Sequence, residues 1–335
     1  MHDEHDDSVV AQRRRHDPVL RTVVGIDVSK ATLDCYFDPS GQRMQVPNDD
    51  DGIAKLLAKL ATLDVELIVI EATGRLHRRV ACELLQVGLL VALLNPQRAR
   101  EYARSIGRLE KTDRVDAQVL ARFGRAAEHQ ILRKPSEKQV ELDDLIARRR
   151  ALVQMRVAEK NRLAEANQPK LAREQSKKLL RLIEQQVEDL DRAVAELVDG
   201  DDDFKRKSEI LTSVPGVSAG TANALLADLP EIGELSRQSI AKLAGVAPLA
   251  NDSGPRRGLR SIQGGRQPVR NALYMAAFNA IKYCERFKQF AKRLTDAGKP
   301  FKVVVTATMR KLLVTLNQMV KTGTTYNPRL VVSIP

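Results

Sequence analysis

The sequence predicts an α/β domain followed by a mostly helical part, and three observations lead to this fold class. Short β-branched runs alternate with amphipathic stretches over the first 130 residues, which favours a layered α/β fold. A stretch without glycine follows, and the chain ends in a strongly basic segment. At 335 residues the chain has room for two or three domains. The predicted parts are a disordered leader (1–20), an α/β domain (21–130), a coiled-coil segment (131–203) and a basic domain (204–335).

The first 20 residues are polar and carry charges of both signs, as is typical of a disordered leader. No apolar run approaches the ~18 residues of a membrane span, and no signal segment opens the chain. We therefore expect a cytoplasmic protein without a membrane partner. Cys35, Cys82 and Cys284 lie far apart and form no Cys-x-x-Cys pair, so we expect reduced and mostly buried thiols.

Three strands are expected at the start of the α/β domain. Residues 22–28 form a β-branched run that is typical of a buried strand. Strands at 31–37 and 42–46 follow, separated by a turn that contains Pro39 and Gly41. These short connections predict an antiparallel meander.

Helices and strands then alternate, which favours some parallel strand pairing. Ile53, Leu56 and Leu60 have the spacing of one helical face. The further expected elements are a strand at 67–70, a helix near 75–87, a strand at 89–94 and helices at 98–106 and 113–128.

Two long helices are expected between residues 137 and 199, meeting near Pro169. The second carries apolar residues at alternating steps of four and three, the pattern of a coiled coil. Such a stripe needs an apolar partner, either a hairpin neighbour or another subunit, and we expect a homo-oligomer, a dimer or a tetramer. Gly200 and the acids at 201–203 are expected to form a solvated linker. The stripe consists of Ile183, Val187, Leu190, Val194 and Leu197.

The net charge of +12 is concentrated at the end of the chain, because residues 204–335 hold 21 basic and 7 acidic side chains. Such a surface attracts the phosphates of nucleic acids, which favours a DNA partner. The pattern at residues 211–218, which contain Pro215-Gly216-Val217, has two interpretations. It predicts either a helix-hairpin-helix element that presents backbone N–H groups to DNA or a plain turn between packed helices. Further helices are expected at 220–228, 268–286 and 302–321.

Four acids are candidates for a metal site. Asp27 closes the first strand, and Glu71 follows the strand at 67–70. Asp113 and Asp116 stand three residues apart, so they share one face at a helix start. Carboxylate oxygens suit Mg²⁺ or Mn²⁺, and these ions assist attack at a phosphodiester.

Each acid also has a simpler explanation. Asp27 could be a solvated strand end, and Asp113 could cap a helix whose dipole favours Asp116. Glu71 is harder to explain in this way, because four apolar residues precede it. Outside the leader only His77 and His129 are present, which argues against a His-based triad or a zinc site.

Taken in order, six segments resemble the insertion-sequence-110 family of transposases over roughly residues 22–320. The resemblance implies an RNase H-like (RuvC-like) domain whose metal ligands would be Asp27, Glu71, Asp113 and Asp116. It also implies a coiled coil and a C-terminal domain with a catalytic serine, which would be Ser253. The six segments are GIDVSK at 25–30, EATG at 71–74, KTDRVDA at 111–117, PGV at 215–217, SG at 253–254 and RNALYMA at 270–276.

Ser253 lies in a polar loop followed by several arginines that suit a scissile phosphate. Its attack on phosphorus would give a phosphoserine intermediate that keeps the bond energy for rejoining. No neighbouring His can act as its base, so an ion-bound hydroxide or a carboxylate of the α/β domain would have to help. Ser213, Ser218 and Ser261 are the competing serines. The arginines are Arg256, Arg257, Arg260, Arg266 and Arg270.

The resemblance further implies recombination of donor and target double-stranded DNA, guided by a structured noncoding RNA, the bridge RNA. A DNA invertase is an open alternative, as is a hydrolytic nuclease such as a junction resolvase that uses only the four acids. A non-catalytic DNA-binding scaffold is a third. An actin-like sugar kinase or ATPase is disfavoured, because its other glycine-rich phosphate loops are absent.

Overall fold

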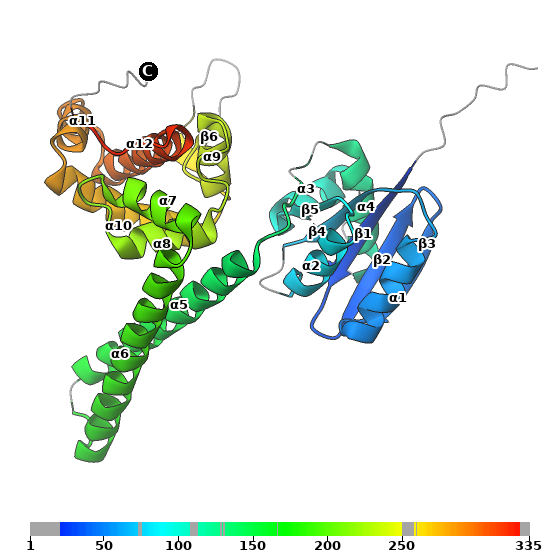
Figure 1. Cartoon of the computed structure of the whole chain (residues 1–335), viewed down its shortest axis with the longest axis horizontal. Coiled ribbons are helices and arrows are strands. Elements are labelled where there is room, and N and C mark those ends of the chain that lie inside the picture. Colours follow the sequence, from blue (N-terminus) through cyan, green and yellow to red (C-terminus); the bar gives the residue numbers. More distant parts are fainter. Residues whose placement is uncertain are drawn as a thin grey trace, which may run out of the picture. The chain divides into compact units, whose positions relative to one another are not determined.

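The computed structural model describes the chain in two compact units, one up to Pro135 and one from Ser136 onward (Figure 1). The first is an α/β unit and the second is almost entirely helical, as predicted. The described residues are 21–72, 76–107, 113–127, 129, 131–165, 167–249, 258 and 260–328, and the side chains of 113–115 are not among them. The leader at 1–20 therefore lies outside the described residues.

A five-stranded mixed sheet forms the centre of the first unit, in the order β3-β2-β1-β4-β5. The first three strands form the predicted antiparallel meander, and β4 and β5 run parallel to β1, so the predicted mixture of pairings is confirmed. The strands are β1 (Thr22–Val28), β2 (Thr32–Asp38), β3 (Gln42–Pro47), β4 (Val65–Glu71) and β5 (Val91–Leu94).

Helices cover both faces of this sheet. Because side chains alternate between the two faces along each strand, each face contributes to its own apolar core. Ile26 and Ile70 face a core that includes residues of α1 (Asp50–Leu60) and α2 (Arg78–Gln86). Val23 and Val69 face the other core, which includes residues of α3 (Pro96–Ser105) and α4 (Asp113–Ala126).

The second unit begins with α5 (Glu137–Ala164) and α6 (Lys170–Asp199), which pair as an antiparallel hairpin. Leu152 packs against Ile183 and Val187, and Arg149 forms an ion pair with Asp191. Part of the predicted apolar stripe is thus buried against the hairpin neighbour. Pro169 stands at the start of α6, where its fixed φ is compatible with the first turn.

The prediction of a solvated linker after Gly200 is wrong. Asp201 caps a further helix, α7 (Asp202–Thr212), and its carboxylate accepts hydrogen bonds from the backbone N–H groups of Asp203 at 3.1 Å and Phe204 at 3.0 Å. Lys138 lies 3.1 Å from the same carboxylate. The run of acids is therefore the start of a helix, where carboxylates are stabilised by the helix dipole.

The remaining helices share one apolar core, with Leu312, Leu313 and Leu316 of the last helix completely buried. The expected helix at 268–286 ends at Tyr283, because Cys284 has extended backbone angles (φ −114°, ψ 113°) and a separate helix follows it. No glycine or proline marks that break in the sequence. The helices are α8 (Ala219–Asp228), α9 (Arg237–Ala244), α10 (Gln267–Tyr283), α11 (Glu285–Asp296) and α12 (Phe301–Thr322).

The predicted turn before α8 is present between α7 and α8, and its role in DNA contact stays a prediction. None of the described helices has the length and apolar character needed to span a membrane. The three cysteines are free, with Cys35 and Cys284 buried and Cys82 half-buried, in agreement with the expectation of reduced thiols.

Candidate active site

Asp27 and Glu71 lie side by side on the sheet. Strands β1 and β4 are parallel, with Ile26 paired to Ile70, so the residue that follows each of these is an acid. Ile26 and Ile70 face the core beneath α1 and α2, which places both acids on the opposite face, where α4 packs. Both acids are half-buried.

Helix α4 crosses this face unusually close to β1, at Gly25. A Cβ atom on Gly25 would lie 2.0 Å from the carbonyl oxygen of Ala117, so only glycine permits the approach. Further along the helix, a Cβ atom on Gly124 would lie 2.9 Å from the side chain of Val23. The helix therefore runs antiparallel to β1, and its first turn lies at the end of the strand that carries Asp27.

Asp113 and Asp116 stand in that first turn of α4, and Asp116 is half-buried. The side chain of Asp113 lies outside the described residues. Among the side chains that are described, no three His, Cys, Asp or Glu residues are grouped closely enough to hold a metal ion. Asp27, Glu71 and Asp116 are all carboxylates, and oxygen donors suit Mg²⁺ or Mn²⁺ rather than zinc.

Asp34 is a fifth acid beside the site that the sequence reasoning missed. It pairs directly with Asp27 across β1 and β2, and its side chain is buried. Gln45 Nε2 donates a hydrogen bond to its carboxylate at 2.9 Å, and Thr32 Oγ1 donates another at 3.3 Å. The signal was the strand register of the meander, which puts Asp34 opposite Asp27 when the short turn at residues 29–31 is closed.

Ser253 lies outside the described residues, as do Arg256 and Arg257, but the two ends of its loop are described. The loop begins in β6 (Pro248–Leu249) and ends in β7 (Ser261–Ile262), which pair as a short antiparallel ribbon. Just below this ribbon, a Cβ atom on Gly265 would lie 2.2 Å from the backbone nitrogen of Gly245. The segment that carries Ser253 is thus held at its base by backbone contacts.

Two of the predicted phosphate-binding arginines are engaged at this loop base. The guanidinium of Arg266 donates two hydrogen bonds to Glu231, both at 2.6 Å, and one to the carbonyl oxygen of Asp228 at 2.9 Å. Arg270 donates to the carbonyl oxygen of Gly264 and to Gln267. Arg260 is exposed next to β7. The contacts of Arg266 and Arg270 hold the loop base together, and phosphate binding by these arginines stays a prediction.

Two of the competing serines have structural roles. Ser213 Oγ donates to the carbonyl oxygen of Ile210 at 2.6 Å and accepts from the N–H of Tyr326 at 2.8 Å. Ser218 caps α8 by accepting from the N–H of Thr221 at 3.3 Å. Ser261 is an exposed residue of β7. Among these three, Ser261 is the remaining alternative nucleophile.

Comparison with known proteins gives two matching family models. Residues 24–166 match the model of the DEDD domain of IS110 transposases, described as "Transposase". Residues 208–292 match the model "Transposase IS116/IS110/IS902 family". The first match contains all four candidate acids, and the second contains Ser253 and the candidate arginines.

Two curated relatives are similar over almost their whole length. The pilin gene-inverting proteins of Moraxella bovis and Moraxella lacunata are each 25% identical over 320 residues, which is 92% of this chain and 99% of those proteins. Among solved structures, RuvC of T. thermophilus in complex with a Holliday junction substrate aligns with 34% of this chain and 100% of its own, at 14% identity and a TM-score of 0.26.

Proposed function

Because the chain belongs to the IS110 family of transposases, and is therefore a DNA recombinase, we propose that it cuts and rejoins DNA with Ser253 as nucleophile and four acids as metal ligands. The single observation that carries the metal half of this proposal is the strand register that sets Asp27 beside Glu71 under the first turn of α4. The resemblance of the loop sequence at 253–254 carries the serine half.

Asp27, Glu71, Asp113 and Asp116 would hold Mg²⁺ or Mn²⁺. When bound, such an ion stabilises the negative charge that develops on a phosphodiester under attack. The acids themselves would position the ion, and the close packing of α4 at Gly25 keeps the first turn of that helix at the strand ends. The buried Asp34 lies opposite Asp27 in the neighbouring strand, and hydrogen bonds from Gln45 and Thr32 hold its carboxylate in place.

In the proposed cleavage step, Ser253 Oγ attacks phosphorus, and a new Oγ–P bond forms as one P–O bond to deoxyribose breaks. The Oγ proton is lost to a neighbouring base, and the departing deoxyribose oxygen gains a proton to become a hydroxyl. The reverse attack by a hydroxyl of another strand rejoins the DNA without ATP. Arginines of the loop hold the phosphate, since guanidinium groups bind phosphate oxygens in pairs.

The proposed partners are donor and target double-stranded DNA and a structured noncoding guide RNA. The basic character of residues 204–335 supports a nucleic-acid partner in general. The protein would act in the cytoplasm, at the nucleoid.

The guide RNA follows from the resemblance to the family. Purification of the protein from cells, followed by sequencing of the copurified RNA, tests this partner. A discrete RNA encoded beside the gene is expected, and random RNA fragments would contradict the proposal.

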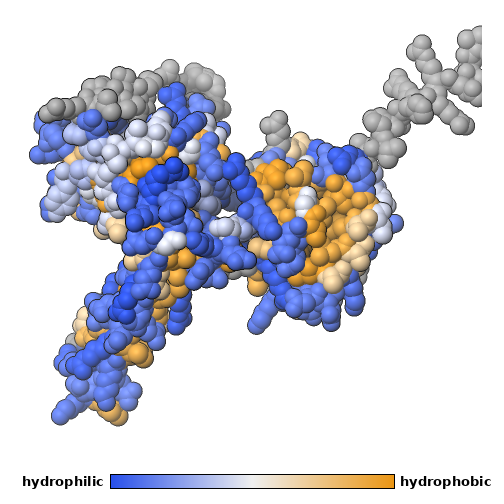
Figure 2. Space-filling view, in the orientation of Figure 1, coloured by the Kyte–Doolittle hydropathy of each residue, from blue (hydrophilic) through white to orange (hydrophobic). Residues whose placement is uncertain are grey.

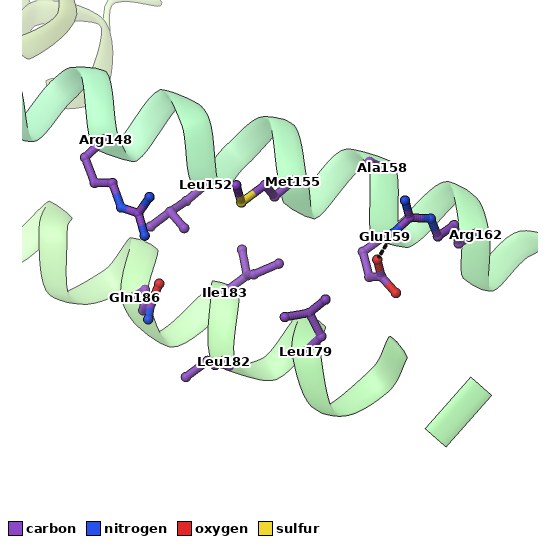
Figure 3. A pocket seen from close by; sticks show the side chains of 10 residues that line it. All are labelled: Arg148, Leu152, Met155, Ala158, Glu159, Arg162, Leu179, Leu182, Ile183 and Gln186. Carbon is purple, nitrogen blue, oxygen red and sulfur yellow. Dashed lines mark hydrogen bonds and ion pairs between the residues drawn. The ribbon is translucent and has the colours of Figure 1, made fainter. Parts of the chain in front are cut away.

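A homo-oligomer is proposed to form through the α5–α6 hairpin. Near its free end, an apolar pocket of about 260 Å³ opens between the two helices (Figure 3). Three of its lining residues are substantially exposed, namely Met155 (52%), Leu179 (45%) and Leu182 (55%). Apolar patches interrupt the hydrophilic surface of the hairpin (Figure 2).

A second copy of the hairpin suits this surface. Residues 137–199 hold 13 basic and 13 acidic side chains, so two hairpins can approach without net repulsion. The substitution L182K is expected to lower the molar mass measured by light scattering after size-exclusion chromatography. The exposed residue Arg192 on the same helix provides the control R192K, which should leave the mass unchanged.

The catalytic proposal is tested by strand cleavage of a plasmid that carries the ends of the element. Ser253→Ala should abolish both the covalent protein–DNA adduct and strand exchange, whereas Ser261→Ala should retain them. D27N and E71Q should abolish metal-dependent cleavage, while D64N, a surface acid of the same unit paired with Arg21, should not. Cleavage that persists in Ser253→Ala would instead support a hydrolytic nuclease.

Inversion is a second candidate outcome, favoured by the alignment of 92% of this chain with the two pilin gene-inverting proteins. A plasmid with two sites in inverted orientation separates the possibilities. Flipping of the intervening DNA supports an invertase, and excision with insertion elsewhere supports a transposase.

A further inference from the structure

Helices α11 and α12 form the most basic part of the described C-terminal unit that lies outside the Ser253 loop. Residues 285–323 contain nine lysines and arginines and only two acids. Both acids are used within α11, where Glu285 lies 3.8 Å from Lys288 and Asp296 lies 3.1 Å from Lys292. Residues 285–323 contain no further acid to balance the other seven cations of this segment.

Phe290 of α11 is the centre of a group of these cations. Lys311 Nζ of α12 lies 4.4 Å from the centroid of the Phe290 ring, and Arg293 Cζ lies 5.4 Å from it. Both distances are within the range of cation–π contacts. Among the ion pairs between described residues, neither Arg293 nor Lys311 has an Asp or Glu partner.

The environment of Lys311 includes two further positive charges. Burial lowers the pKa of the Lys311 ammonium, and the positive charges of Arg286 and Arg293 lower it further. Three like charges held together raise the free energy of the protein unless an anion neutralises them. The cation–π contacts with the ring of Phe290 offset only part of this repulsion. Each of them stabilises a cation by less free energy than a charge-assisted hydrogen bond to an anion.

We propose that Arg293 and Lys311, together with Arg286 and the ring of Phe290, form a binding site for the sugar-phosphate backbone of a nucleic acid. This site is additional to the arginines of the Ser253 loop, and it rests on the proposed function only in taking a nucleic acid as the ligand. A phosphodiester brings an anion to Arg293 and Lys311, and guanidinium and ammonium groups both bind phosphate oxygens. The shared ligand chemistry is a phosphate backbone, which duplex DNA and folded RNA both offer.

Binding as a function of salt tests the proposal. The full-length Ser253→Ala protein without divalent metal is titrated into a labelled duplex DNA and, separately, a labelled RNA hairpin, with fluorescence anisotropy as readout. R293Q/K311Q should reduce the slope of log affinity against log salt by about two, since each lost phosphate contact removes about one. The control K288Q/K292Q removes two charges from α11 that already have acidic partners, and its slope should change by much less.

A reduced slope with DNA, with RNA or with both supports the site and identifies which nucleic acid it binds. Unchanged slopes with both ligands overturn it, as does an equal reduction in the control. If thermal unfolding shows that the double variant is not folded, the single variant R293Q, at an exposed position, should reduce the slope by about one. No cleavage occurs in this experiment, so its result is independent of whether Ser253 is the nucleophile.

Discussion

Gln118 Nε2 of α4 donates a hydrogen bond to the hydroxyl oxygen of Tyr36 on β2, at 3.2 Å. Arg43 Nη2 of β3 donates to Gln118 Oε1 at 3.3 Å and stacks over the Tyr36 ring at 5.0 Å from its centroid. These contacts connect α4 to two strands of the meander and fix its rotation. Asp116, two residues before Gln118, is thereby held at the end of β1 near Asp27.

Removal of this hydrogen bond should loosen α4. Tyr36→Phe leaves Gln118 buried without its acceptor, so the free energy of unfolding should fall by about 1 kcal/mol. Urea unfolding followed by circular dichroism measures the change. Tyr102→Phe is the control, because the Tyr102 ring packs on Phe123 while its hydroxyl makes no hydrogen bond to a described residue. Equal losses in the two variants would contradict a specific role for the Tyr36 hydroxyl.

Gly25→Ala should displace α4. The new methyl group would meet the carbonyl oxygen of Ala117 at 2.0 Å and the backbone nitrogen of Ala121 at 2.5 Å, and neither backbone atom can move without shifting the helix. Such overpacking costs about 1–3 kcal/mol of unfolding free energy. Gly220→Ala, at an open position in α8, should be neutral or stabilising in the same urea experiment.

Metal binding should stabilise the α/β unit through the four acids. At a Mg²⁺ concentration ten times the Kd, linkage gives about 1.4 kcal/mol of added stability. The melting temperature should therefore rise with Mg²⁺ and return to its starting value after chelation. D27N should not show the rise, whereas D64N should show all of it. If the melting temperature of D27N still rises with Mg²⁺, the ion binds at another site.

Acid should weaken the start of α7 through Asp201. Hydrogen bonds from the backbone of Phe204 lower the pKa of this carboxyl below its ordinary value of 3.8, and Lys138 contributes further. The stabilisation is fully present above the ordinary pKa and is lost as the pH falls through the lower folded value. At pH 6, Asp201→Ala should reduce the unfolding free energy by about 1 kcal/mol.

The difference between Asp201→Ala and the native protein should then shrink as the pH falls below 3.8. Asp201→Asn retains an oxygen that accepts the capping hydrogen bonds, so it should lose less stability at pH 6 than the alanine variant. Urea unfolding at several pH values measures both effects. A difference that stays constant down to acidic pH would contradict the role of the charge.

The three thiols should differ in reactivity. Burial, together with the charge of Asp34, raises the pKa of Cys35 to about 12, so almost no thiolate exists at pH 8. Cys284 is also buried and lies 3.1 Å from the Tyr326 hydroxyl. Iodoacetamide at pH 8, followed by mass spectrometry, should modify the half-buried Cys82 first, and all three in urea. Modification of Cys35 as fast as Cys82 would show that the sheet opens readily.

Much of the fold could be predicted because each element carries its own local pattern. The β-branched run at 22–28 and the Pro39 turn predict the meander without reference to distant residues. The break at Cys284 could not be predicted, because no helix-breaking residue causes it and packing of α11 against its neighbours sets it. The acids at 201–203 were misjudged because the same residues suit a solvated linker and a helix start.

The sequence by itself determined the residue types of the site, the two strands whose ends carry Asp27 and Glu71, and the family to which the chain is similar. Tertiary structure alone decided that β1 and β4 are neighbours in register, that α4 descends onto Gly25, and that Asp34 lies opposite Asp27. The physical reason is that periodicity reports which face of an element is apolar, whereas strand partners and close helix contacts depend on side chains far away in the chain.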